Sequence, residues 1–151
     1  MSNSRVFRAL VCCSVLAGFS FATDDNPPPS DLDKYNVVWN TPGTNASSSM
    51  PIGNGEIGLN VWVEEDGDLR FYIGRTDAWS EACRLLKVGA VRLSLSPNPF
   101  AKGLPFCQQL VLRDGRIEIK GGAADADVTL RLFVDANAPV IHVTGKSSKP
   151  V

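Results

Sequence analysis

Apolar and polar residues alternate with a period of two along several short stretches of the chain, which is the pattern of half-buried β-strands. The clearest stretch spans residues 57–64, and the alternation returns in residues 69–73 after the loop Glu65-Asp66-Gly67-Asp68. Short polar loops of this kind join antiparallel strands, so the sequence predicts a β-hairpin. One face of its first strand holds Ile57, Leu59, Val61 and Val63.

Further alternating stretches predict strands at residues 37–39, 90–96, 107–113, 117–119, 128–134 and 140–144. Asp114-Gly115 is a strong turn signal between two of them. Residues 40–49 are predicted to form a loop, and residues 76–87 an irregular excursion. About seven or eight short strands without a convincing long helix indicate an all-β fold, an antiparallel β-sandwich.

The first 22 residues have the pattern of a secretory signal peptide. Arg5 and Arg8 precede an uncharged apolar run, and Ser20-Phe21-Ala22 offers small residues for cleavage. The alternative is an uncleaved membrane anchor, although a span needs about 20 apolar residues. Residues 23–34 are polar and proline-rich, which predicts a flexible lead-in to a folded domain over residues 35–151. We expect a secreted or periplasmic protein that is free of the membrane after cleavage.

Charge and cysteine content narrow the possible partners. Of the 15 basic residues, Arg5 and Arg8 would leave with the signal peptide. The predicted mature chain then has 13 basic and 16 acidic residues, which is a net charge of −3. Such a surface argues against nucleic acid as a partner. Cys83 and Cys107 remain, and they are predicted either to form one disulfide or to stay as two buried free thiols. With the single His142 they do not make a metal site, and no cofactor is expected.

The stretch GNGEIG, residues 53–58, has the G-x-G-x-x-G spacing of a dinucleotide-binding turn. That turn needs a strand before it and a helix that opens within it. Here Pro51 precedes the motif, and the residues after it alternate as a strand. The sequence therefore argues against a nucleotide site.

The glycines of this stretch are instead predicted to be structural. Gly53 and Gly55 are expected to supply positive φ or close backbone approach in a loop, and Gly58 to let a neighbour pack against the strand. The side-chain amide of Asn54 remains open to two uses, since it can bind either the backbone of its own loop or a ligand.

We assign no catalytic residue from the sequence. His142 lies in an alternating stretch and is predicted to be structural or solvent-facing, and no G-x-S-x-G elbow is present. Asp77 and Trp79 form a pairing that carbohydrate sites use, with a ring that stacks on the sugar and an acid that accepts hydroxyl protons. A capping Asp77 and a core Trp79 would account for the same residues. The candidate sugar-binding residues are Asn54, Asp77 and Trp79.

Several ordered motifs over residues 35 to about 148 resemble a known group of domains. YNVVWN (35–40), MPIGNGEIG (50–58) and residues 106–119 resemble the N-terminal β-sandwich of family 95 glycoside hydrolases, the α-L-fucosidase group. IGRTDAW (73–79) and SPNPF (96–100) look closer to a bacterial relative, domain of unknown function 5703. In the fucosidase group the catalytic acid and base lie in a helical barrel that follows the sandwich, so the resemblance places no catalytic residue in this chain.

The resemblance implies a non-catalytic N-terminal sandwich module of an exported, glycoside hydrolase-like protein. On this reading the sandwich is truncated, and its partner is a C-terminal catalytic domain missing from the chain, which is expected to be inactive alone. The alternative is a self-standing secreted sandwich that binds carbohydrate without hydrolysing it. In both cases a carbohydrate is the expected ligand of the whole protein.

Overall fold

The computed structural model describes residues 30–123 and 125–150. The predicted signal peptide and residues 23–29 of the predicted lead-in lie outside these ranges. The described elements are two 3-10 helices, η1 (Asp33–Tyr35) and η2 (Ala46–Ser48), and the strands β1 (Val37–Trp39), β2 (Met50–Gly53), β3 (Ile57–Val63), β4 (Leu69–Trp79), β5 (Leu85–Leu93), β6 (Phe106–Val111), β7 (Arg116–Ala123), β8 (Ala126–Val134) and β9 (Ile141–Ser147).

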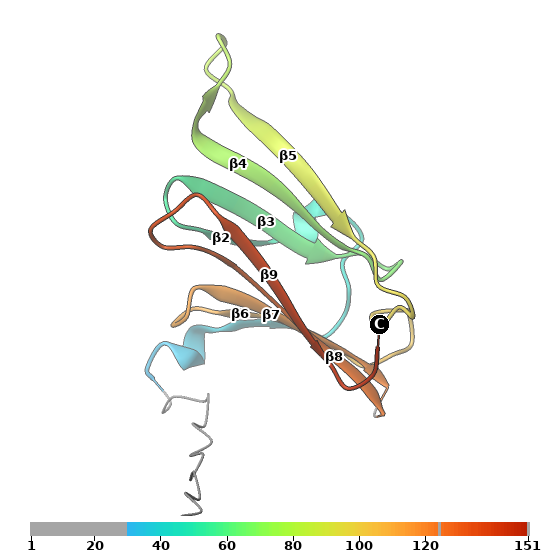
Figure 1. Ribbon diagram of the computed structural model, residues 1–151. Helices are drawn as coiled ribbons and strands as arrows, with labels where there is room; N and C mark the ends of the chain where they lie inside the picture. Colours follow the sequence, from blue (N-terminus) through green and yellow to red (C-terminus); the bar gives the residue numbers. More distant parts are fainter. Residues whose placement is uncertain (1–29, 124, 151) are drawn as a thin grey trace, which may run out of the picture.

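The strands form two antiparallel sheets that face each other, which confirms the predicted all-β antiparallel sandwich (Figure 1). One sheet has the order β1-β6-β7-β8-β9, and the other has the order β2-β3-β4-β5. Across residues 30–123 and 125–150, no helix has the length and apolar character needed to cross a membrane.

The core is built from alternating strand positions. In β8, Val128, Leu130 and Leu132 are buried, while the residues between them are only half-buried. Full burial of one such side chain contributes about 1.5–3 kcal/mol, so the inward rows of the two sheets hold them together. The buried cluster comprises Met50, Leu59, Val61, Val63, Leu69, Phe71, Phe100, Ile117, Ile119, Val128, Leu130, Leu132 and Val134.

A strand precedes the glycine motif, which the sequence analysis did not predict. β2 pairs with β3, and the pairing sets Gly53 opposite Gly58. Pro51 has no backbone N–H to donate, but β2 is an edge strand, where a proline is tolerated. The backbone N–H of Asn54 donates to the carbonyl oxygen of Ile57 at 3.1 Å and closes the turn between the two strands. The motif is therefore the turn of a β-hairpin rather than the start of a helix.

The prediction of an irregular excursion over residues 76–87 is wrong. β4 continues to Trp79 and β5 begins at Leu85, so these strands form a long hairpin. Its register shifts where Lys87 pairs with Gly74, and pairing resumes with Trp79 opposite Leu85. We call residues 75–86 the arm, because this part of the hairpin extends beyond the two sheets (Figure 1). Pairing between the strands, rather than a local sequence pattern, keeps the segment extended.

The two sheets approach each other most closely where β2 meets β7 and β8. A buried hydrogen bond also joins them, since Gln108 Nε2 donates to the carbonyl oxygen of Val61 at 3.2 Å. The arm end of β4 and β5 points away from the other sheet (Figure 1). On β5, Val91 lies opposite the core residue Phe71, yet it remains 39% exposed.

Candidate binding groove

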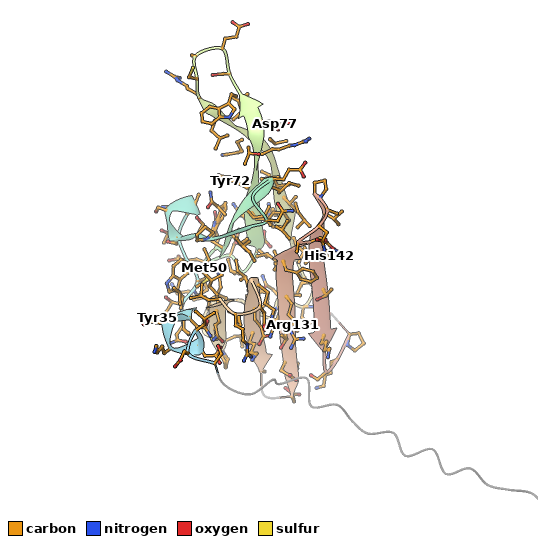
Figure 2. The ribbon with its side chains drawn as sticks, turned by 90° about the vertical axis from the view of Figure 1, so that its left-hand side faces the viewer. Tyr35, Met50, Tyr72, Asp77, Arg131 and His142 are labelled. Carbon is orange, nitrogen blue, oxygen red and sulfur yellow. The ribbon has the colours of Figure 1, made fainter. Side chains whose placement is uncertain are left out.

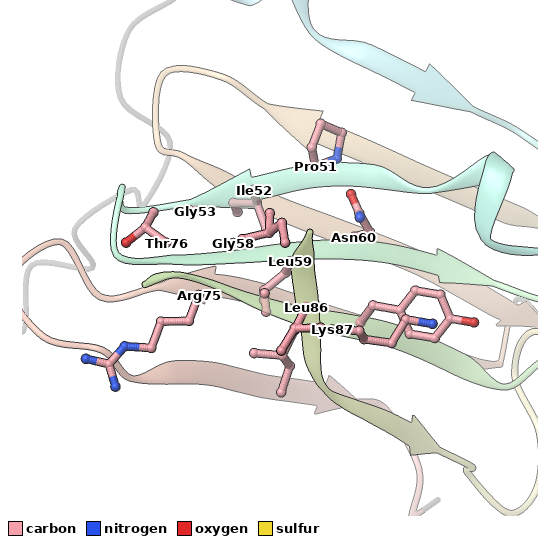
Figure 3. Close-up of a pocket in the computed structure, with 14 residues that line it drawn as sticks. Pro51, Ile52, Gly53, Gly58, Leu59, Asn60, Arg75, Thr76, Leu86 and Lys87 are labelled. Atoms are coloured by element: carbon pink, nitrogen blue, oxygen red, sulfur yellow. The ribbon is translucent and has the colours of Figure 1, made fainter. Parts of the chain in front are cut away.

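A row of three glycines crosses the outer face of the second sheet. Gly53 lies opposite Gly58, and Gly58 lies opposite Gly74, so three neighbouring strands present bare backbone side by side. An added Cβ at Gly58 would meet nothing within 4 Å, and one at Gly74 would approach only the Gly58 carbonyl oxygen, at 3.9 Å. The row is therefore the floor of an open groove of about 550 Å³ (Figure 3).

Polar and apolar side chains line the two sides of this floor. On one side, Pro51, Asn60 and Tyr72 form the next row of the sheet because they are cross-strand partners. On the other side lie side chains of the arm, namely Arg75, Thr76, Leu85 and Leu86, while Lys87 of β5 extends toward the Tyr72 ring. The bend of β5 at its register shift brings Leu86 and Lys87 beside the glycine floor (Figure 3).

The two cations of the groove are in different electrostatic settings. Arg75 is shared between two carboxylates, with Nη2 3.0 Å from Glu56 Oε1 and Nε 3.1 Å from Asp77 Oδ1. Lys87 lies with its ammonium 3.3 Å from the centroid of the Tyr72 ring. No ion pair of Lys87 occurs within the described part of the chain. The groove thus offers one uncompensated cation beside an aromatic ring.

Tyr72 is itself fixed by a neighbour. Its ring meets the ring of Trp62 edge-to-face, with 4.9 Å between the centroids. Trp62 is only 2% exposed, although it lies on the outer face, and its indole N–H donates to Glu64 Oε1 at 3.1 Å. Edge-to-face pairs of this kind contribute about 0.5–1.5 kcal/mol beyond burial. The Tyr72 ring is therefore held in place by contacts within the protein itself.

Asn54, the first of the predicted sugar-binding residues, has its side chain occupied by backbone groups. Its amide nitrogen donates to the carbonyl oxygens of Asp135 at 2.8 Å and Ala138 at 3.1 Å. Its oxygen accepts from the backbone N–H groups of Glu56 and Ile57, both at 2.9 Å. These four contacts use the full capacity of the amide. They tie the β2–β3 turn to the β8–β9 loop, so the geometry favours the structural role of Asn54.

Asp77 and Trp79, the other two candidates, lie on the arm and not in the groove (Figure 2 shows Asp77 above Tyr72). Both are exposed, Asp77 with 65% of its side chain and Trp79 with 57% of the residue. The indole N–H of Trp79 donates to the carbonyl oxygen of Thr76 at 2.7 Å. The alternative of a capping Asp77 and a core Trp79 is therefore wrong, because no helix forms here and the ring is not buried.

The three glycines named from the sequence have distinct surroundings. Gly55 has a φ of 93°, in the left-handed region that favours glycine. A Cβ on Gly53 would lie 2.5 Å from the carbonyl oxygen of Ile57, so the tight turn leaves no room for one. Gly58 has open space over it instead of the predicted packing neighbour. The sheet simply has no second layer on this face at Gly58.

Cys83 and Cys107 are both free thiols; Cys83 lies in the turn between β4 and β5, and Cys107 lies in the other sheet. Cys83 is exposed at the tip of the arm with a φ of 54°, and Cys107 is half-buried in β6. The structure thus contains no disulfide between them, and the alternative of two buried thiols is wrong for Cys83. His142 stacks on Phe133 with 4.6 Å between the ring centroids, as a structural strand residue does.

A cluster of charged side chains lies where β3 turns into β4. The carboxylate of Asp68 is almost fully buried, accepts a hydrogen bond from Arg92, and lies 3.9 Å from Arg70 Nη2. A hydrogen bond from Ser94 is the main cause that lowers the pKa of Asp68; burial opposes it, and Arg92 and Arg70 lower the pKa further. Asp68 therefore stays ionised and anchors the two arginines. No group of three or more His, Cys, Asp or Glu side chains in the described ranges is placed to hold a metal ion.

The groove residues that sequence reasoning missed include Asn60, Tyr72, Gly74, Thr76 and Lys87. Two of them carried a usable signal, because Asn60 and Tyr72 occupy the outward positions of the predicted hairpin. Lys87 carried none, since it falls in the segment that was predicted to be irregular. The glycine row becomes visible only once the strand register is known.

The fold and the groove together define an antiparallel β-sandwich module with one bare, open outer face and a projecting arm. Residues 38–151 match the family model of the N-terminal part of DUF5703, a domain of unknown function, and the chain belongs to this family. The closer of the two resemblances drawn from the motifs is thereby confirmed, whereas the likeness to family 95 glycoside hydrolases stays a prediction. No curated protein matches the chain.

Proposed function

We propose that the chain is a non-catalytic sandwich module of an exported, glycoside hydrolase-like protein, and that it docks against the catalytic domain of that protein. The observation that carries this proposal is the exposed apolar surface of the arm and β5. Trp79 and Leu85 are 57% and 56% exposed, and Leu86 and Val88 are 46% and 57% exposed. Exposed apolar side chains gathered on one hairpin in this way are typical of an interface with another protein part.

Two further points support the proposal. The family model is that of an N-terminal domain, and such a domain is followed by other parts of its protein. The motifs resemble the sandwich that precedes the helical catalytic barrel in the α-L-fucosidase group, which makes a glycosidase the favoured class for the parent protein. In that arrangement acid and base catalysis belongs to the barrel, and the sandwich positions and stabilises it.

The test compares the chain alone with the parent protein in its complete reading frame, each assayed on α-L-fucosides and other glycosides. We expect turnover by the parent protein and none by the chain. In the parent protein, Leu86→Ser should lower the melting temperature, because it removes an apolar contact of the proposed interface. Leu112→Ser is the matched control, since Leu112 is 40% exposed in the turn between β6 and β7, away from the arm. Hydrolysis by the chain alone, or a parent protein without a second domain, would contradict the proposal.

A self-standing carbohydrate-binding module is the second candidate, and the glycine-floored groove is the observation that favours it. A sugar ring needs a flat surface, an aromatic neighbour and hydrogen-bonding groups. The groove supplies all three in the bare backbone row, Tyr72, and the side chains of Asn60, Thr76 and Lys87. Isothermal titration with oligosaccharides is the direct measurement.

Gly58→Val is expected to block this groove without harming the fold. No atom lies within 4 Å of a Cβ at this position, and valine favours strands more than glycine does. The free energy of unfolding should therefore stay the same or rise by up to about 1 kcal/mol, whereas the affinity for a sugar should fall at least about tenfold. Gly53→Ala is the contrasting variant, because its Cβ would clash with the Ile57 carbonyl and lower stability. Unchanged sugar binding by Gly58→Val would exclude the groove as the site.

A further inference from the structure

Asn54 and Gly55 form a dipeptide that is chemically labile in a flexible chain. The backbone nitrogen of the glycine can attack Cγ of the asparagine, and glycine hinders this attack least because it has no Cβ. No other asparagine of the chain precedes a glycine. The remaining asparagines of residues 30–123 and 125–150 precede Val, Thr, Ala or Pro, and they are Asn36, Asn40, Asn45, Asn60, Asn98 and Asn137. The sequence therefore singles out one position for spontaneous deamidation.

Deamidation replaces the side-chain amide of Asn54 by a carboxylate. The Gly55 nitrogen loses its proton to the solvent and bonds to Cγ of Asn54, the bond between Cγ and Nδ2 breaks, and Nδ2 takes up a proton and leaves as ammonia. The cyclic imide that results takes up a water molecule and opens at either of its carbonyls. One opening gives aspartate, and the other gives isoaspartate, in which the backbone runs through Cβ and Cγ of the former side chain. Water is the only co-reactant.

The fold holds the Asn54 amide against this reaction. Nδ2 donates to the carbonyl oxygens of Asp135 at 2.8 Å and Ala138 at 3.1 Å, so its departure breaks two hydrogen bonds. Oδ1 accepts from the backbone N–H groups of Glu56 and Ile57, both at 2.9 Å. Attack makes Cγ tetrahedral, which moves both atoms out of the positions that these four bonds fix. The reaction therefore requires the β2–β3 turn to open locally from the β8–β9 loop.

We propose that Asn54-Gly55 is a conformation-gated deamidation site, protected while the turn is bound to the β8–β9 loop and reactive when this contact opens. The product cannot restore the contact, because a carboxylate has no N–H to donate and places its charge against the same two carbonyl oxygens. Isoaspartate also adds a backbone carbon to the turn that sets Gly53 opposite Gly58. Deamidation thus makes a transient opening permanent. This chemistry requires neither a catalytic domain nor a sugar, so it is independent of the proposed function.

Peptide mapping of the complete chain by mass spectrometry tests this inference. The chain is incubated at one mildly alkaline pH, either folded or in concentrated urea, and isoaspartyl methyltransferase labelling identifies the isoaspartate product. In urea, Asn54 should convert faster than every other asparagine. In the folded chain its conversion should be at least about tenfold slower than in urea, because four hydrogen bonds must open first. Gly55→Ala, assayed in urea where folding plays no part, should slow the conversion at least about tenfold.

Asp135→Ala is the variant that should speed the reaction in the folded chain without a change in the reacting dipeptide. The Asp135 carboxylate accepts from the backbone N–H of Asn137 at 2.8 Å and lies 3.6 Å from His142 Nε2, so it shapes the loop that holds Asn54. Its removal should raise the folded-state rate at least about threefold. Asp114→Ala, in the turn between β6 and β7, is the matched control and should leave the rate unchanged.

Thermal melting shows whether either variant is folded, and the comparison of folded and urea-treated unaltered chain is independent of both. Equal rates at Asn54 in the folded and unfolded chain, or an unchanged rate in a folded Asp135→Ala protein, would overturn the inference. A folded chain that reacts faster than the unfolded one would overturn it as well, because the N–H groups of Glu56 and Ile57 would then activate Oδ1 as an oxyanion hole does.

Discussion

Asn54→Ala is expected to lower the free energy of unfolding by about 3 kcal/mol, the upper range for a single hydrogen-bonding side chain. The alanine leaves the carbonyl oxygens of Asp135 and Ala138 and the N–H groups of Glu56 and Ile57 without their partner. Leaving such groups unsatisfied costs more than one hydrogen bond is worth. Denaturant unfolding followed by tryptophan fluorescence measures the change.

Two further variants test whether the loss of stability in Asn54→Ala comes from these hydrogen bonds. Asn60→Ala removes the same amide from an exposed position on the adjacent strand, and its effect should stay within about 0.5 kcal/mol. Asn54→Asp keeps the oxygen that accepts from the turn but loses the donors to the β8–β9 loop. Its stability should therefore be intermediate between those of Asn54→Ala and Asn60→Ala. An Asn54→Ala protein as stable as the unaltered chain, with weakened sugar binding, would instead restore Asn54 as a ligand residue.

Local patterns were sufficient to predict the parts of the fold that local pairing forms. The hairpin of β3 and β4 was predicted because strict alternation flanks a short polar loop. The turn at Asp114-Gly115 was predicted from its own chemistry, and Gly115 indeed has a φ of 58°. β8 was predicted as an alternating strand over residues 128–134, and its row of Val128, Leu130 and Leu132 is indeed buried. In each case the signal lies within about ten residues of sequence.

The missed elements depend on partners that the local sequence does not reveal. β2 is short and contains Pro51, so only its pairing with β3 makes it a strand. The arm was not predicted because apolar and polar residues do not alternate over residues 76–87. The extended conformation of this segment depends on pairing between the two strands of the hairpin. The strand preference of a residue depends strongly on the strands and side chains around it.

The candidate site also depends on contacts between residues that are distant in the sequence. Asn54 was singled out correctly as an unusual residue, but its partners Asp135 and Ala138 are 81 and 84 residues away in the sequence. The glycine row needs the register of three strands, and its third member, Gly74, lies outside the motif. The G-x-G-x-x-G spacing therefore includes two glycines of the groove floor because of strand pairing, and not because of nucleotide binding.

The stability of the chain is expected to fall as the pH drops below about 5, and Asp68 should account for part of this loss. Its folded-state pKa lies below the ordinary value of 3.8. A carboxylate with a lowered pKa adds stability that is complete above its unfolded pKa and is lost as the pH falls through the folded value. The pKa values of Glu118 and Asp135 are lowered as well, so acid destabilises the chain through more than one group.

Asp68→Asn isolates the contribution of Asp68. At pH 7 the variant should be less stable by about 1–2 kcal/mol, because it loses charge-assisted hydrogen bonds, while solvent screens the 64% exposed Arg92. This difference should shrink as the pH falls below the ordinary carboxyl pKa of 3.8 and vanish once the pH lies below the lowered folded-state pKa, since protonation removes the same charge from the unaltered chain. Asp77→Asn is the control, because it removes a carboxylate that is 65% exposed, and at pH 7 its stability should stay within about 0.5 kcal/mol of that of the unaltered chain. A difference between Asp68→Asn and the unaltered chain that stays constant with pH would mean that Asp68 stabilises the β3–β4 turn by shape and not by charge.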